Sequence, residues 1–164
     1  MNTHTIILAA GKGTRMNTNL PKVMQPLGGM SLIEHVISTA QEISKKITVV
    51  IGHQKNLLKE HLAEIDPIIE TVNQENQLGT AHAVKTASHL IQDDEKVLIL
   101  YGDVPLISNK TIQSLLDSEN KCTLLSMILS NPTGYGRIVS NEENLALKII
   151  EQKDASEDER KIKE

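Results

Sequence analysis

The sequence predicts an α/β fold: a Rossmann-like, mostly parallel, doubly wound sheet with a β-hairpin near the C-terminus. Apolar runs alternate with segments of helical periodicity from residue 5 to residue 129, which is the pattern of βαβ units with right-handed crossovers. The first apolar run is almost continuous, as in strands that are buried on both faces. After Pro132, two short β-type segments flank the polar turn NEEN at residues 141–144, which indicates the hairpin.

The first half of the chain divides into three strands and two helices. We expect the first strand at residues 5–10 (TIILAA), followed by a loop that reaches Pro21. A helix begins at Ser31, because Ser31 and Glu34 have the spacing of a capping box. The remaining elements follow in order: a strand at 47–51, a helix at 54–65 and a strand at 68–72.

The second half continues the alternation and then changes character. Its first elements are, in order, a helix at 80–91, a strand at 96–101 and a helix after the N-cap Ser108. The apolar run CTLLSMIL, residues 122–129, is expected to be a fifth buried strand, and the hairpin follows at 134–150. Residues 151–164 carry ten charges in fourteen positions, which predicts an exposed helix or a frayed tail.

The composition is that of a globular protein with one core: 164 residues, 39% hydrophobic and 23% charged. The net charge of -4 gives no basic field, so we expect no nucleic-acid partner. The lone Cys122 cannot form an internal disulfide and is expected to be a buried thiol, which favours a reducing compartment. No apolar stretch reaches the ~20 residues of a membrane span, and the N-terminus lacks signal-peptide features, so a cytoplasmic location is expected.

The loop LAAGKGTRM, residues 8–16, has the composition of a phosphate-binding loop. It is not a Walker A loop, which has the pattern G-x-x-x-x-G-K-[ST]. In this sequence the Gly-Lys pair is followed by glycine rather than Ser or Thr, and no glycine stands five residues before the pair. It fits the dinucleotide fingerprint poorly, because Met16 replaces the third glycine. Its glycines let backbone N–H groups face an anion, and Arg15 and Lys22 add positive charge. Taken alone, the loop fits equally well with a tight turn that carries solvated basic residues.

Three loops follow predicted strands and carry polar groups: GKGTR, NQENQLGT and YGDVPL. Ligands bind beyond the carboxyl ends of strands in doubly wound sheets, so we expect these loops to share one rim. Asp103 suits Mg²⁺, which prefers one or two carboxylates plus phosphate oxygens, although an Asx-turn is the alternative. Gln74 and Gln77 either read the edge of a base or are surface amides. Gly79 and Thr80 stand at a helix start, where free N–H groups favour polar ligand atoms.

Six motifs together make the chain recognisable: LAAGKGTRM, LPKVMQPL, NQLGTAHAV, LYGDVPLI, PTGYGRIV and IIEQKDASEDERKIKE. With these motifs in this order, the chain resembles the uridyltransferase (pyrophosphorylase) domain of the bifunctional N-acetylglucosamine-1-phosphate uridyltransferases/glucosamine-1-phosphate acetyltransferases. The first motif alone indicates only the wider sugar-phosphate nucleotidyltransferase superfamily. QLGTAHA with YGDVPL and PTGYGR is more specific, and the resemblance covers nearly the whole sequence.

The resemblance implies a role for each matching residue. Arg15 and Lys22 are the implied catalytic residues, which hold the triphosphate and its developing charge, and Asp103 is the implied ligand of Mg²⁺. Gln74 is the implied reader of uracil. The residues implied to bind substrate are Leu8, Ala9, Ala10, Gly11, Gly13, Lys22, Gln74, Gly79, Thr80, Tyr101, Gly102, Asp103, Gly136 and Glu151, the last two on the amino-sugar side.

The implied reaction is nucleotidyl transfer. A phosphate oxygen of N-acetylglucosamine 1-phosphate attacks the α-phosphorus of UTP in line, which gives UDP-N-acetylglucosamine and pyrophosphate. The product serves peptidoglycan and lipopolysaccharide synthesis. No protein nucleophile is required, so positioning and charge stabilisation by Mg²⁺, Arg15 and Lys22 are expected to dominate.

The sequence departs from the family at Met30, where lysine is usual, and at Gln25, where histidine is common. The resemblance also implies that residues 1–164 are the N-terminal part of a nucleotidyltransferase domain, without the β-helical acetyltransferase domain that forms the family's homotrimer. The family's second metal-side residue would lie beyond Glu164, so we expect little activity from this chain alone. Two alternatives stay open: a transferase of the molybdenum-cofactor guanylyltransferase type, and a non-catalytic fragment that binds nucleotide.

Overall fold

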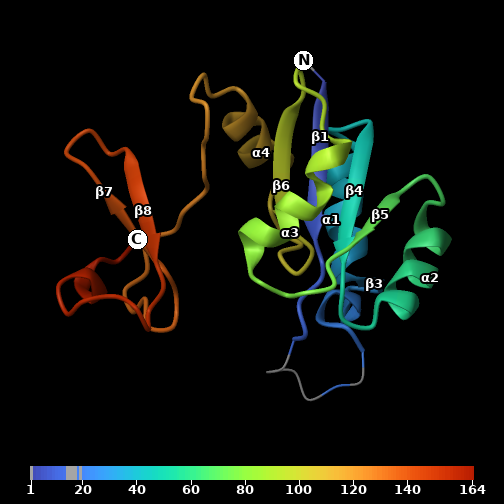
Figure 1. Ribbon diagram of the computed structural model, residues 1–164, viewed down its shortest axis with the longest axis horizontal. Helices are drawn as coiled ribbons and strands as arrows, with labels where there is room; N and C mark the ends of the chain where they lie inside the picture. The colour runs from blue at the N-terminus through green and yellow to red at the C-terminus, as the bar shows by residue number, and fades with distance from the viewer. Residues whose placement is uncertain (1, 14–17, 19) are drawn as a thin grey trace. The chain divides into compact units, whose positions relative to one another are not determined.

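The computed structural model describes residues 2–13, 18 and 20–164 of the chain. The chain divides into two compact units, residues 1–118 and 119–164, which are considered separately below. The first unit contains a parallel sheet with the strand order β5-β4-β1-β6 (Figure 1). Its strands are β1 (Thr3–Leu8), β4 (Lys46–Ile51), β5 (Glu70–Asn73) and β6 (Lys96–Tyr101). The predicted mostly parallel sheet is therefore present.

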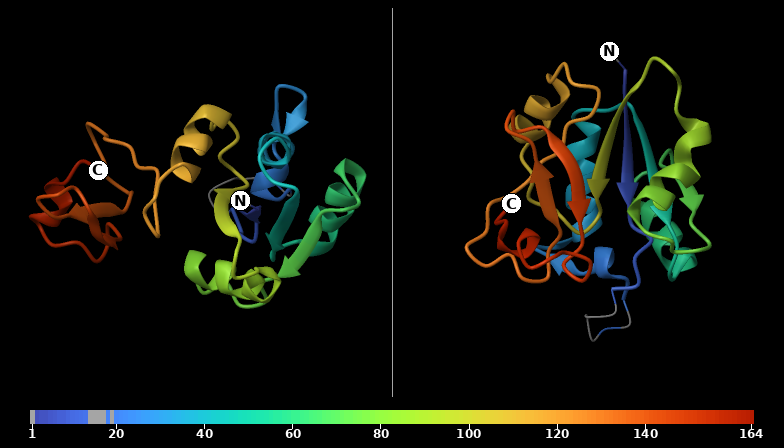
Figure 2. Two further views of the ribbon diagram at one scale, coloured as in Figure 1. Left: turned by 90° about the horizontal axis from the view of Figure 1, so that it is seen from above. Right: turned by 60° about the vertical axis from the view of Figure 1, so that its left-hand side comes forward.

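Helices cover both faces of this sheet, as the doubly wound class requires (Figures 1 and 2). The helices are α1 (Leu32–Gln41), α2 (Lys55–Ile65), α3 (Thr80–Ala87) and α4 (Asn109–Leu116), with 3₁₀ turns η1 (Lys22–Met24) and η2 (Ser88–Leu90). A small antiparallel pair, β2 (Pro26–Leu27) and β3 (Met30–Ser31), precedes α1. The side chain of Ser31 and that of Glu34 form the predicted capping box at the start of α1.

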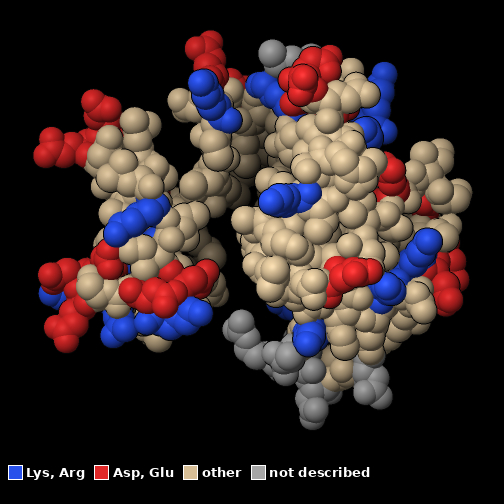
Figure 3. Space-filling view, viewed as in Figure 1, with Lys and Arg blue, Asp and Glu red and all other residues tan. Residues whose placement is uncertain are grey.

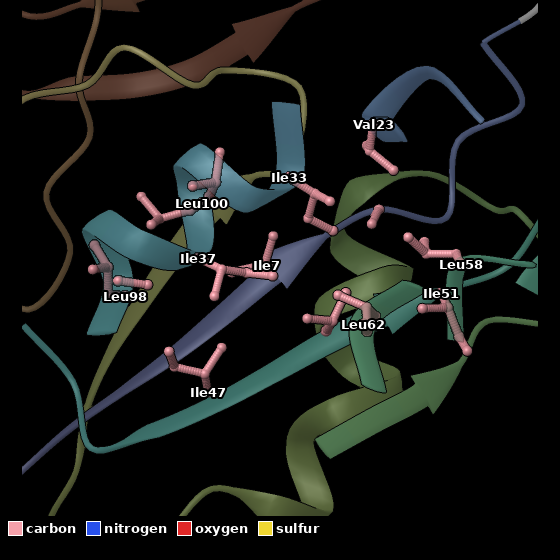
Figure 4. Packing of buried hydrophobic residues seen from close by; sticks show 14 of the residues in the cluster. Ile7, Val23, Ile33, Ile37, Ile47, Ile51, Leu58, Leu62, Leu98 and Leu100 are labelled. Carbon is pink, nitrogen blue, oxygen red and sulfur yellow. The ribbon is translucent and has the colours of Figure 1, made fainter. Parts of the chain in front are cut away.

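The core has two layers because successive side chains of a strand point to opposite faces. Ile7 of β1 packs on one face among side chains of α1, α2 and α4. Figure 4 shows Ile7 with the α1 and α2 side chains of this layer. Ile6, its neighbour in the chain, packs on the other face with Ala83 and Ala87 of α3. Burial of each large aliphatic side chain contributes about 1.5–3 kcal/mol. The layers are aliphatic, as expected for a chain without Phe or Trp.

Several element boundaries in the first unit differ from the sequence prediction; β1, for example, spans Thr3–Leu8 rather than 5–10. The strand expected at 68–72 begins at Glu70, because the carboxylate of Asp66 accepts the Ile68 N–H and forms a turn. Ile68 is consequently 87% exposed. The helix expected at 80–91 is α-helical only to Ala87 and ends in η2.

The second unit contains the predicted hairpin, formed by β7 (Arg137–Ser140) and β8 (Ala146–Ile150), and a 3₁₀ turn η3 (Glu159–Lys161). The buried guanidinium of Arg137 donates to the Tyr135 carbonyl and to Oε1 of Gln152, so it joins the segments that enter and leave the hairpin. The charged C-terminal stretch is mostly turns rather than a regular helix.

The expectation of a fifth buried strand at 122–129 is wrong. These residues form no strand, and Ile128 is 78% exposed. A fully buried strand needs neighbours on both faces, and a two-stranded hairpin with one 3₁₀ turn is too small to supply them. The expectation of a buried thiol fails for the same reason, since Cys122 in this segment is exposed.

Basic and acidic side chains are interspersed on the face of each unit shown in Figure 3. This agrees with the net charge of -4, which offers no broad basic surface. Among the described residues, no helix has the length and apolar character that would be needed to cross a membrane.

Candidate functional site

A pocket of about 280 Å³ lies at the carboxyl ends of strands β1, β5 and β6. This is where ligands bind in doubly wound sheets. Eleven of the predicted site residues line it: Leu8, Ala9, Ala10, Gly11, Gly13, Lys22, Gln74, Gly79, Thr80, Tyr101 and Asp103. The three loops expected to share one rim therefore do so.

The loop after β1 follows the neighbouring strands closely. Ala9 and Ala10, which were expected at the end of the strand, already belong to this loop. The Ala9 N–H donates to the carbonyl of Val50 at 2.9 Å, and the N–H of Gly102 donates to the carbonyl of Leu8 at 3.0 Å. Gly102 does not line the pocket itself but joins the loop to the end of β6. The backbone of the rim is thus fixed by its own hydrogen bonds.

Gly13 needs to be glycine for two reasons. Its φ of +57° lies in the left-handed region, and a Cβ at this position would lie 2.9 Å from Cβ of Lys22. The missing side chain lets the start of η1 approach the loop, so that Lys22 reaches the pocket.

Lys22 and Asp103 form the charged part of the pocket. Nζ of Lys22 lies 2.5 Å from Oδ2 of Asp103, and their side chains are 43% and 26% exposed. A pair with this exposure contributes at most about 1 kcal/mol to stability. Breaking this ion pair therefore costs little, and each of the two groups can bind a ligand instead.

Two glutamines organise the opposite side of the pocket. Gln74 is only 4% exposed, and its Nε2 donates to the Gly79 carbonyl at 3.2 Å and contacts Nδ1 of His82 at 3.0 Å. Nε2 of Gln77 donates to the carbonyl of Ala10 at 3.0 Å and so ties the loop after β5 to the loop after β1. Gln77, for which the sequence left open a reader of a base edge or a surface amide, lines the pocket.

Val23 and Ala83 also line the pocket and were missed. Their aliphatic side chains carry no chemical signal, so only the fold reveals them. A second, more open pocket of about 700 Å³ lies beside the first at the ends of β4 and β5 and shares Gln74 and Gln77 with it. We place the candidate site in the smaller pocket because it holds the glycine loop and the Lys22–Asp103 pair.

Three predicted site residues remain: Arg15, Gly136 and Glu151. Arg15 falls outside the described residues, so its role stays a prediction. Gly136 and Glu151 belong to the second unit, where they flank the hairpin. A Cβ on Gly136 would lie 3.3 Å from Cγ2 of Ile149, which is a packing reason for glycine there. Their expected contacts with the amino sugar stay a prediction.

Outside the pocket, the pKa values of four groups are shifted by local contacts. Burial lowers the pKa of His4 in β1, whose Nε2 contacts the hydroxyl of Thr48 in β4 at 2.8 Å. The backbone N–H of Ser31 lowers the pKa of Glu34, that of Gln92 lowers the pKa of Glu95, and that of Ser156 lowers the pKa of Glu159 to about 2. The three glutamates stabilise turns and helix starts, whereas His4 links β1 to β4. The described residues contain no cluster of three or more His, Cys, Asp or Glu side chains that could hold a metal.

Comparison with known proteins identifies the family of the chain. The profile of the MobA-like NTP transferase domain matches residues 5–140. The chain belongs to this family of NTP transferases. It is 46% identical over 161 residues to the bifunctional protein GlmU of Xanthomonas campestris pv. campestris (strain B100), with 98% of this chain and 35% of that protein covered. The NTP transferase chain thus spans about a third of the length of this relative, and the resemblance seen in its motifs is confirmed.

Solved structures share the fold. HddC from Yersinia pseudotuberculosis, in complex with GMP-PN, matches with a TM-score of 0.66 at 20% identity, covering 92% of this chain and 69% of that chain. Rv0371C from Mycobacterium tuberculosis H37Rv, in complex with manganese, matches with a TM-score of 0.59 at 16% identity, covering 71% of this chain and 59% of that chain. These similarities establish the nucleotidyltransferase-like fold predicted from the sequence.

Proposed function

We propose that this NTP transferase binds UTP and N-acetylglucosamine 1-phosphate and transfers UMP to the sugar phosphate. The observation that carries the proposal is the pocket, in which the glycine loop, the Lys22–Asp103 pair and Gln74 meet at one strand edge. The identity of 46% to a bifunctional GlmU favours uridylyl transfer among the reactions of this fold. The cytoplasm, where such nucleotides are made, is the proposed location.

In the proposed reaction each group of the pocket has one task. The N–H groups of the loop around Gly11 and Gly13 and the ammonium of Lys22 bind the phosphates. Gln74 binds the base. The substrates are thereby held for in-line attack of the sugar phosphate on the α-phosphorus, while Lys22 stabilises the negative charge that develops on the leaving pyrophosphate.

Asp103 is the proposed ligand for Mg²⁺. The position beside its carboxylate suits a cation, because Nζ of Lys22 lies there at 2.5 Å. A single carboxylate also fits magnesium sites in which substrate phosphates supply further oxygens. When bound, the ion would neutralise charge on the triphosphate. Binding of a metal–nucleotide complex would release Lys22 from Asp103 so that the ammonium can bind phosphate.

The test is a calorimetric titration of the chain with UTP and with GTP in the presence of Mg²⁺. We expect tighter binding of UTP. Lys22→Ala should weaken UTP binding about 10- to 100-fold, which is the usual loss for a charge-assisted hydrogen bond. Lys12→Ala is the matched control, because it also removes one lysine charge, from the nearby glycine loop, at a residue that does not line the pocket. Equal losses in both variants would contradict the proposed phosphate site.

A guanylyltransferase is the second candidate, favoured by the match to the MobA-like domain profile. The same titration separates the two candidates. A preference for GTP over UTP would replace the uridylyl proposal, whereas binding of UTP without any release of pyrophosphate would indicate a nucleotide-binding protein rather than an enzyme.

A further inference from the structure

The side chain of Gln74 is held from two directions. It is buried at the end of β5, where its backbone N–H donates to the carbonyl of Ile51 at 2.8 Å. Its Nε2 contacts the carbonyl of Gly79 at 3.2 Å and Nδ1 of His82 at 3.0 Å. Gly79 is the N-cap of α3 and His82 lies in its first turn, so both contacts of the Gln74 amide come from the N-terminal end of this helix.

The chemistry of these partners fixes the orientation of the amide. The carbonyl of Gly79 only accepts hydrogen bonds, so the nitrogen of Gln74, and not its oxygen, has to face it. This carbonyl is itself held, because it also accepts the Ala83 N–H at 3.1 Å. Nδ1 of His82 then meets a donor and has to accept, which requires a neutral imidazole with its proton on Nε2.

With both amide hydrogens engaged, Oε1 is the hydrogen-bonding atom that Gln74 can offer to a ligand in the pocket. A lone acceptor that faces N3 of the base distinguishes the two pyrimidine bases. Uracil presents an N–H donor at N3, whereas cytosine presents a lone pair there. With cytosine, the N3 lone pair and Oε1 of Gln74 would both be acceptors, and a buried polar group would remain unpaired. The cost of this unpaired group exceeds the gain from a typical hydrogen bond.

We propose that His82 is a positioning residue that makes the site selective for uracil over cytosine, by holding the second amide hydrogen of Gln74. This inference rests on the proposed uridylyl function and extends it. Without His82, the Gly79 carbonyl still orients the amide of Gln74. The second N–H of this amide, however, becomes available to a ligand. Gln74 then offers a donor as well as an acceptor, and cytosine finds a partner.

The test compares the affinities of UTP and CTP, with Mg²⁺, for the full chain and its variants at about pH 8, where an ordinary histidine is neutral. We expect the unmodified chain to prefer UTP by about tenfold or more. His82→Leu, which lacks the acceptor, should reduce the preference to about threefold or less. His82→Asn, which places an acceptor oxygen at the same branch, should restore it. His89→Leu is the control, because His89 is exposed in η2 and does not line the pocket.

A second readout does not need a ligand. In the folded chain labelled with ¹⁵N-histidine, nuclear magnetic resonance should show the proton of His82 on Nε2, and a proton on Nδ1 would overturn the inference. It would also be overturned if folded His82→Leu kept the full preference for UTP over CTP. A chain that prefers GTP to UTP would overturn the uridylyl function, and with it the selectivity proposed here, whatever the behaviour of the His82 variants.

Discussion

Replacement of Gly52 by alanine tests how the end of β4 supports the pocket. A Cβ at residue 52 would lie 2.9 Å from Cβ of Ala10 and 3.0 Å from its carbonyl oxygen. The second contact is with backbone, so a side-chain rotation cannot relieve it. The same carbonyl accepts hydrogen bonds from the N–H of His53 at 3.3 Å and from Nε2 of Gln77 at 3.0 Å. A shift of Ala10 would therefore stretch both bonds.

We expect Gly52→Ala to lower the free energy of unfolding by about 1–3 kcal/mol, the usual cost of an added methyl in a packed region. Because Ala10 belongs to the pocket wall, the affinity for UTP should also fall, by about fivefold or more, on the order of 1 kcal/mol. Urea denaturation measures the first effect, and calorimetric titration measures the second.

Gly11→Ala is the matched control for stability. Apart from Gly11 itself and its two chain neighbours, no described residue has an atom within 4 Å of a Cβ on Gly11, so the free energy of unfolding of this variant should change by less than about 0.5 kcal/mol. If Gly52→Ala were as stable as Gly11→Ala, the close contact between β4 and the loop would not support the pocket, and the reasoning would be refuted.

Three further predictions concern single side chains. Asp103→Asn should change the free energy of unfolding by less than about 1 kcal/mol, because the pair with Lys22 is partly exposed. It should nevertheless lower the affinity for UTP in the presence of Mg²⁺ about tenfold. Calorimetric titration with and without Mg²⁺ checks this, and an unchanged effect of Mg²⁺ on UTP affinity would count against Asp103 as the ligand. Glu34→Gln should be less stable than the unmodified chain at neutral pH, because the Ser31 N–H lowers the pKa of Glu34 in the folded state. The stability that ionised Glu34 contributes is present above its unfolded pKa and is lost as pH falls through its folded pKa. The free energies of unfolding of the two proteins should therefore converge in acid, and a difference that does not change with pH would refute this prediction. Cys122, being exposed, should react with a thiol reagent in the native protein at nearly the rate seen in urea, and protection until unfolding would contradict the structure of residues 122–129.

The sequence predicted the sheet of the first unit because its signals are local. The apolar runs at 47–51 and 96–101, the capping box at Ser31 and the N-cap at Ser108 each act within a few residues, and each is found in the structure. The pocket followed from topology, since the carboxyl ends of parallel strands meet at one edge. Gln74 and Asp103 could therefore be placed together although they are far apart in the chain.

Features that depend on tertiary neighbours could not be predicted in this way. The run at 122–129 has the composition of a buried strand, but composition does not say whether partners are present to cover it. The contact of His82 with Gln74 depends on how the start of α3 meets the end of β5, and Val23 lines the pocket only because η1 folds back on the rim. These are properties of packing rather than of periodicity.

A crystal structure of the chain with UTP and Mg²⁺ tests the central claim most directly. The account predicts the uracil ring against Gln74 and Gly79 and the triphosphate beside Lys22, in the pocket of about 280 Å³ at the ends of β1, β5 and β6. A nucleotide bound instead in the neighbouring pocket at the ends of β4 and β5, with its phosphates at Lys55, would contradict it.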